Sequence, residues 1–147
     1  MSGKLRTDRL EDAVNGLYAM PRSPGALKKL AAGLNYAWID LDLATVIDKV
    51  AFLQACQQAL GLPEHFGANW DALNDCIQDL SWRPAPGYVI CIGRGGESSR
   101  KSPDDFATAL EIVEEAAEYW SQHEKAFIVL LDAQTRGRRK LKQVPFA

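Results

Sequence analysis

Three stretches of the chain distribute apolar residues in ways that predict β-strands. In the segment AWIDLDL, Ile39, Leu41 and Leu43 alternate with polar or larger amphipathic residues, and a period of two is typical of a strand. Residues 88–92 (YVICI) and 126–131 (AFIVLL) are apolar without a break, as expected for strands of a parallel sheet that is covered on both faces.

Apolar residues at helical spacing predict three helices among these strands. We expect them at residues 48–60, 69–80 and 102–122, with a loop at 93–101. Asp48, Asn69 and Ser102 are suitable N-caps for them. The expected buried residues are Val46, Val50, Leu53 and Leu60 in the first helix, Trp70, Leu73, Ile77 and Leu80 in the second, and Phe106, Leu110, Val113, Ala117 and Trp120 in the third. The order β-α-α-β-α-β predicts an α/β fold in which helices pack on a small three-stranded parallel sheet.

The two ends of the chain differ from this central part. Leu10, Val14 and Leu17 are spaced for one face of a short helix, and the segment MPRSPG that follows resembles a linker. We therefore divide the chain into an N-terminal extension (1–35), a main domain (36–132) and a basic C-terminal tail (133–147).

Composition limits the class of protein. The chain has 147 residues, of which 47% are hydrophobic and 24% charged, as in an ordinary globular protein. No apolar run has the length of a membrane span, and the N-terminus lacks the apolar segment of a secretory signal. Cys56, Cys76 and Cys91 are far apart and have no CxxC spacing, which favours reduced thiols in a cytoplasmic protein over a disulfide or metal site.

The net charge of -2 hides an uneven distribution of charge. Residues 1–35 carry +3 and residues 133–147 carry +5, so residues 36–132 carry -10. A central part this acidic favours association with a basic partner and disfavours free nucleic acid. The basic tail argues the other way, but only locally.

The helix predicted at 69–80 carries two acidic residues on its outer face. Asp71 and Asp75 are four residues apart, and like charges at this spacing destabilise a helix by a few tenths of a kcal/mol. A basic partner would convert this repulsion into charge-assisted hydrogen bonds, which are bidentate where arginine supplies them. The alternative interpretation is an ordinary solvated helix face.

Residues 62–76, LPEHFGANWDALNDC, carry the most specific motif in the chain. Its leucine-proline-glutamate, aromatic-glycine, asparagine, aspartate-alanine-leucine and aspartate-cysteine elements resemble the recognition segment of the barstar family. These are intracellular protein inhibitors of barnase-type ribonucleases, and the resemblance extends over about two-thirds of the chain. It implies that acids standing in for RNA phosphates block the cleft of a ribonuclease. The two helix aspartates of the family correspond to Asp71 and Asp75, and a further acid on the next helix corresponds to Glu115.

The resemblance also implies a set of partner-binding residues and a kind of partner. A tyrosine of the family's loop is His65 here and a helix tryptophan is Asn74, which implies a target other than barnase. The expected partner is a basic extracellular or toxin ribonuclease, bound by a monomeric immunity-type protein that has no catalytic residues, metal or cofactor. The expected contact residues are His65, Phe66, Gly67, Asn69, Asp71, Asn74, Asp75, Gln78 and Glu115.

Two other functions compete with this interpretation. An enzyme could use His65 and Asp75 as an acid–base pair, or add Asp71 to make a metal site, but neither spacing matches a known signature. The segment GRGGES lacks the lysine of a phosphate-binding loop. The alternative that we keep is a nucleic-acid-associated binding module, which would use the basic segment RGRRKLK of the tail.

Overall fold

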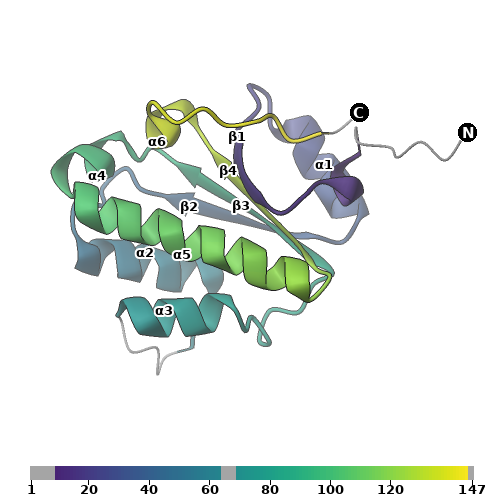
Figure 1. Cartoon of the computed structure of the whole chain (residues 1–147), viewed down its shortest axis with the longest axis horizontal. Coiled ribbons are helices and arrows are strands. Elements are labelled where there is room, and N and C mark those ends of the chain that lie inside the picture. Colours follow the sequence, from purple (N-terminus) through teal and green to yellow (C-terminus); the bar gives the residue numbers. More distant parts are fainter. Residues whose placement is uncertain (1–8, 64–68, 146–147) are drawn as a thin grey trace, which may run out of the picture.

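The computed structural model describes residues 9–63 and 69–145. Figure 1 shows a twisted sheet with the long helix α5 lying across it and α3 beneath α5. In chain order the elements are the 3-10 helix η1 (Leu10–Asp12), β1 (Gly16–Ala19), α1 (Gly25–Gly33), β2 (Ala37–Asp42), α2 (Lys49–Leu60), α3 (Trp70–Ile77), β3 (Gly87–Gly93), α4 (Gly96–Lys101), α5 (Pro103–Gln122), β4 (Ala126–Leu131) and α6 (Ala133–Arg136).

The sheet of the described chain has four parallel strands in the order β1-β4-β3-β2. The predicted α/β class, with parallel strands covered by helices, is confirmed, but the prediction of three strands is wrong. The fourth strand is β1, which pairs with β4 in the register Gly16 to Ile128 and Ala19 to Leu131. It covers a row of backbone groups that would otherwise leave β4 as an open sheet edge.

The side chain of Asn15 explains why this segment is a strand and not the predicted helix. Its amide nitrogen donates to the carbonyl oxygens of Ala117 (3.2 Å) and Lys125 (2.8 Å), and its oxygen accepts from the backbone nitrogen of Phe127 (2.7 Å). These contacts fix the start of β1 beside β4. Val14, expected on a buried helix face, is 74% exposed.

Two apolar cores lie on opposite faces of the sheet. Along β4, Phe127 and Val129 face the first core and Ile128 and Leu130 face the second. Helices α2, α3 and α5 supply the first core. Leu10 of η1, Leu27 and Ala31 of α1, and Val144 near the C-terminus supply the second. Burial on both sides explains why β3 and β4 are apolar throughout.

Two of the three predicted N-cap residues cap their helices through a side-chain hydrogen bond. Asp48 and Asn69 accept hydrogen bonds from the backbone nitrogens of Ala51 and Ala72, each at 2.8 Å. Ser102 does not cap α5, because its hydroxyl donates to the carbonyl oxygen of Ile47.

Two details of the predicted helices are wrong. Val50 is 64% exposed, because the buried stripe of α2 follows Phe52, Cys56 and Leu60 instead. Helix α3 ends at Ile77 and not at Leu80, which is buried in the following turn with a positive φ.

Segments that were expected to be irregular contain further helices. The expected linker before residue 35 contains α1, and the expected loop at 93–101 contains α4. The tail also packs on the fold, because the Ala19 nitrogen donates to the Lys142 carbonyl oxygen at 2.8 Å and Val144 is buried. The division of the chain at residues 35 and 132 stays a prediction. None of the helices in the described chain combines the length and apolar character needed to cross a membrane.

Candidate partner-binding face

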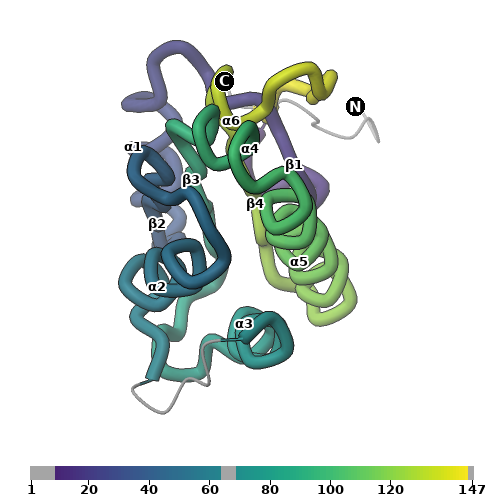
Figure 2. Tube along the Cα trace, turned by 90° about the vertical axis from the view of Figure 1, so that its left-hand side faces the viewer, coloured from purple at the N-terminus to yellow at the C-terminus, as the bar shows by residue number. Residues whose placement is uncertain are grey.

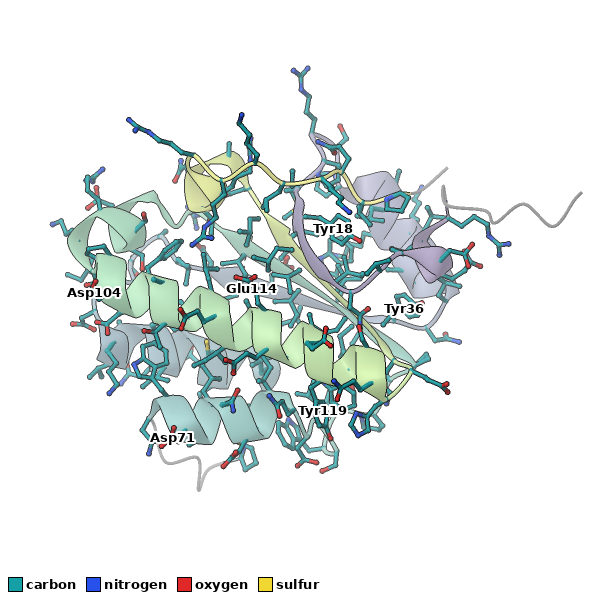
Figure 3. The ribbon with its side chains drawn as sticks, in the orientation of Figure 1. Tyr18, Tyr36, Asp71, Asp104, Glu114 and Tyr119 are labelled. Carbon is teal, nitrogen blue, oxygen red and sulfur yellow. The ribbon has the colours of Figure 1, made fainter. Side chains whose placement is uncertain are left out.

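Helix α3 is held by its apolar side, so that its two aspartates point outward. Leu73 and Ile77 are fully buried, and the ring of Trp70 lies 5.8 Å from that of Phe52 on α2, centroid to centroid. The opposite side carries Asp71 and Asp75, both exposed, with the partly buried Asn74 and Gln78 beside them. Figure 3 shows Asp71 at the start of α3, at the edge of the molecule. The prediction of an exposed face is confirmed for Asp71 and Asp75, whereas Asn74 and Gln78 are partly buried.

A buried hydrogen bond joins α3 to α5. The indole nitrogen of Trp120 donates to the carbonyl oxygen of Ile77 at 3.0 Å, which satisfies a carbonyl in the last turn of α3. The ring of Tyr119 stacks edge-on against Trp120, with centroids 5.0 Å apart. The position of α3 is therefore fixed relative to the long helix by both packing and a directed contact.

The two flanks of α5 carry different glutamates. Glu114 and Glu118 line a hollow of about 340 Å³ together with Leu17 of β1 and Arg139. Glu115 lies three residues after Ile112 and four before Tyr119, and residues at these spacings share one side of a helix. Both of these neighbours pack against the first core, to which α3 contributes.

Glu115 is therefore on the flank of α5 away from β1, along which α3 packs. We call Asp71, Asp75 and Glu115 the acidic face. The sequence placed the three residues on two helices, α3 and α5, and these two helices pack against each other.

The carboxylates of the acidic face have no basic partner in the described part of the chain. The ion pairs there join Arg9 to Glu11 and Asp12, Arg94 to Asp42, and Glu97 to Arg100 and Lys101. Lys49, which lies close by, has its ammonium group 5.8 Å from the centre of the Trp70 ring. The acidic face therefore carries negative charge that no ion pair with a described residue neutralises.

The other predicted contact residues have separate outcomes. Asn69 is occupied as the cap of α3. The Gln78 amide donates to the Asn74 oxygen at 3.3 Å, so these two amides form a polar strip beside the aspartates. His65, Phe66 and Gly67 lie outside the described residues.

An apolar surface at the start of α2 was not predicted from the sequence. Ile47 is 46% and Val50 is 64% exposed, and they flank Lys49 in the region that meets Trp70. The missed signal is the spacing of Phe52, Cys56 and Leu60, because a stripe centred on these residues leaves Val50 about 120° away around the helix.

Metal-ligating side chains and thiols were the other candidates for chemistry in the described chain. No group of three or more metal-ligating side chains occurs among the residues that the structure describes. Burial raises the pKa of Cys56 and of Cys91 to about 12, so these two are unreactive thiols that contribute to packing.

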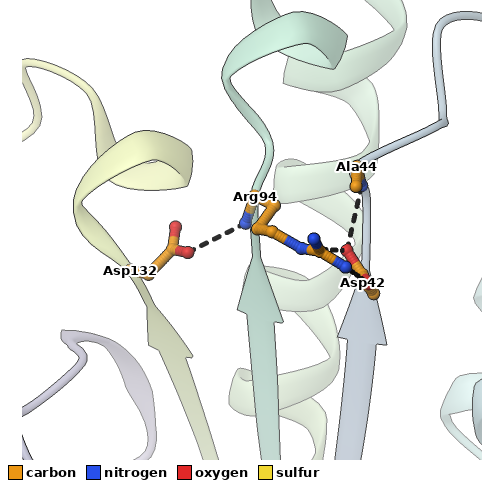
Figure 4. Close-up of polar contacts among 4 residues, drawn as sticks. All are labelled: Asp42, Ala44, Arg94 and Asp132. Atoms are coloured by element: carbon orange, nitrogen blue, oxygen red, sulfur yellow. Dashed lines mark hydrogen bonds and ion pairs between the residues drawn. The ribbon is translucent and has the colours of Figure 1, made fainter.

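A second polar cluster lies at the carboxyl ends of the strands, as Figure 4 shows. Arg94, which follows β3, has a positive φ of 55°. Its backbone nitrogen donates to Asp132 after β4 at 2.8 Å, and its guanidinium Nε donates to Asp42 of β2 at 3.0 Å. Asp42 also accepts from the Ala44 backbone nitrogen at 3.0 Å. The cluster thus ties together the ends of three neighbouring strands.

We predict that this cluster makes stability sensitive to acid. Two hydrogen-bond donors lower the pKa of the Asp42 carboxyl below its ordinary value. The Arg94 guanidinium has the larger effect, and the backbone N–H of Ala44 adds to it. A lowered folded-state pKa contributes stability above the unfolded pKa of about 4, and this contribution disappears as the pH falls through the folded value. The effect is small because the pair is exposed.

Urea unfolding at pH 7 and pH 3 tests this prediction. Asp42→Asn should be less stable than the parent at pH 7, and the difference should shrink at pH 3. Asp40→Asn, on the same strand without an arginine partner in the described chain, is the matched control. A difference for Asp42→Asn that is equal at both pH values would contradict the assignment.

The geometry defines a class of protein: a small parallel α/β domain with exposed carboxylates on two packed helices, α3 and α5, that form no ion pair within the described part of the chain. A model of the family described as barstar (barnase inhibitor) matches residues 36–132, from the residue before β2 to the residue after β4. The match covers well over half of the chain, and the protein belongs to the barstar family. A search of curated proteins gave no match.

Proposed function

We propose that this protein inhibits a basic ribonuclease by covering its active site with the acidic face. The observation that carries the proposal is the outward position of Asp71 and Asp75, without basic partners among the described residues, on a helix that α5 holds in place. Membership of a family of barnase inhibitors gives this surface its context. The proposed inhibitor is a cytoplasmic monomer that protects its cell from a ribonuclease that the cell secretes or from a toxin of a rival cell.

The proposed mechanism is electrostatic mimicry of the substrate. A ribonuclease cleft holds cationic side chains that bind RNA phosphates, and carboxylates at matching positions can accept the same hydrogen bonds. Each bond made by Asp71 or Asp75 would also relieve the repulsion between them, since they are one helical turn apart. The fixed position of α3 lowers the cost of ordering the surface on binding.

Titration against the ribonuclease tests the proposal. The partner is first captured from the native cells, or from the products of neighbouring genes, and its activity on RNA is then measured with increasing amounts of the purified protein. We expect complete inhibition at equimolar protein, while the protein alone leaves RNA intact. RNA cleavage by the protein alone that is lost in His65→Ala would overturn the proposal in favour of an enzyme.

We also predict that association with the ribonuclease depends strongly on salt. The segment that contains the acidic face carries a net charge of -10, and opposite charges accelerate encounter at low ionic strength. The barnase–barstar pair is the reference case for this behaviour, so the expectation is carried over from the family. Stopped-flow rates should fall by at least about tenfold between low and high salt. Equal rates at both would argue against electrostatic recognition.

A further inference from the structure

A hollow lies at the end of the molecule opposite helix α3. It has a volume of about 480 Å³ and opens between the start of α5 and the turn after α6. Figures 1 and 2 both show α6 and the C-terminal segment at the top of the molecule and α3 at the bottom. Three of the residues that line it are arginines, and none of the lining residues is acidic. The lining residues are Ser99, Pro103, Phe106, Ala107, Thr135, Arg136, Gly137, Arg138 and Arg139.

The arginines of the hollow differ from the other bases nearby. On α4, Arg100 and Lys101 both pair with Glu97. Arg136, Arg138 and Arg139 make no ion pair with any described residue. The exposed residues Lys140 and Lys142 continue the positive charge along the chain. Five cations therefore follow one another within seven residues, none of them in an ion pair with a described residue, and Arg139 also lines the hollow that contains Glu114 and Glu118. We call residues 136–142 the basic segment.

The basic segment is held in position by the fold. At its start, the Arg136 backbone nitrogen donates to the Asp132 carbonyl oxygen at 2.8 Å. At its end, the Lys142 carbonyl oxygen accepts from β1 and Val144 is buried in the second core. The Nε atom of Arg136 is buried and has no hydrogen-bond partner among the described residues. A buried guanidinium donor of this kind needs an acceptor, and Arg136 is one of the residues that line the hollow.

The surface chemistry favours a nucleic acid over an acidic protein. Protein–protein interfaces have cores that are depleted of charge and rich in aromatic groups. In the basic segment the one apolar side chain, Leu141, is partly buried, and the aromatic ring in the hollow, Phe106, is 6% exposed. Closely spaced guanidinium groups with few apolar neighbours are typical of phosphate recognition, because each guanidinium can bind two phosphate oxygens.

We propose that the hollow binds a phosphate of a single-stranded RNA and that the strand continues along the basic segment. The site is separate from the two aspartates of the proposed inhibitory surface, because α3, which carries them, lies at the other end of the molecule (Figure 2). One molecule can therefore hold RNA and a ribonuclease at the same time. The ordered position of the cations lets the strand bind without first folding the segment.

Fluorescence anisotropy with a labelled single-stranded RNA of about 12 nucleotides tests this proposal. The logarithm of the affinity should fall linearly with the logarithm of the salt concentration, with a slope of about -0.7 for each phosphate neutralised. Arg138→Ala/Arg139→Ala should reduce the steepness of that slope by about 1.4, which corresponds to roughly 25-fold weaker binding at 0.1 M salt if the lines meet near 1 M.

The control is Lys28→Ala/Lys29→Ala on α1, which removes the same charge from another exposed site. It should keep the parent slope, and Arg138→Ala/Arg139→Ala should melt like the parent because both arginine side chains are exposed. An equal loss of RNA affinity in the two double variants would show that only net charge matters, and would overturn the proposed site. Equally tight binding of a glutamate peptide of the same length would indicate an acidic protein partner. Equally tight binding of a nucleoside diphosphate would exclude the extended strand.

Discussion

Replacing Asp75 with alanine is expected to weaken binding to the cognate ribonuclease by at least about 2 kcal/mol, roughly 30-fold, and by more than Asp71→Ala or Glu115→Ala. Along the outer side of α3, Asp75 has Asp71 one turn before it and Gln78 one turn after it. It therefore lies in the middle of the surface, where interface hot spots gather, and its removal leaves a partner cation desolvated and unpaired. Barnase and barstar are the reference pair for such hot spots, so the effect is inherited from the family and the ranking is the prediction.

The stability of the same variants separates a binding role from a structural one. Helix α3 ends two residues after Asp75, so this carboxylate lies near the negative end of the helix dipole. Its removal also relieves the repulsion with Asp71, and Asp75→Ala should therefore be as stable as the parent or slightly more stable. Asp71 lies in the first turn, where the dipole favours a negative charge. Asp71→Ala should therefore gain less stability than Asp75→Ala.

Calorimetric titration with the ribonuclease and thermal melting measure both quantities. Glu114→Ala is the matched control for Glu115→Ala, because it removes the same charge one residue earlier, on the flank that faces β1. It should bind nearly like the parent. If Asp75→Ala binds like the parent, or if it unfolds the domain, the acidic face is not the inhibitory surface.

Local signals explain which parts of the fold could be predicted from the sequence. Strands β2, β3 and β4 have continuous or alternating apolar residues, and helices α2 and α3 begin at side chains, Asp48 and Asn69, that cap them within three residues. Strand β1 could not be found in this way. It pairs with residues more than a hundred positions later and is fixed by Asn15, whose three hydrogen bonds all reach distant residues.

The candidate site shows the same division between local and distant information. The shared side of Asp71 and Asp75 follows from a spacing of four residues in a helix, and needs no tertiary structure. The separation of Glu115 from Glu114 required the packing of α5, because both are exposed and adjacent in sequence. Composition also could not predict that residues 136–142 have a defined conformation. That conformation depends on the completed sheet, through the burial of Val144 and the contact with β1.

Replacing Trp120 with alanine is expected to have the largest effect on stability, with a loss of about 3–5 kcal/mol. Its side chain is 7% exposed within the first core, and its loss leaves both a cavity and an unpaired Ile77 carbonyl oxygen at the end of α3. Trp120→Phe keeps most of the ring but removes the donor, so we expect about 1–3 kcal/mol, the cost of leaving that carbonyl unsatisfied.

The same substitutions test whether α5 positions the acidic face. Trp120 is buried and cannot touch a partner, so a lower affinity of folded Trp120→Phe for the ribonuclease would have to come from displacement of α3, which its indole nitrogen holds at 3.0 Å. Tyr119→Phe changes the neighbouring ring without removing a hydrogen bond of the described chain, and should match the parent in both properties. Urea unfolding gives the stability, and calorimetry under conditions where each variant is folded gives the affinity. Parent-like affinity in Trp120→Phe, despite its lower stability, would mean that packing alone places Asp71 and Asp75.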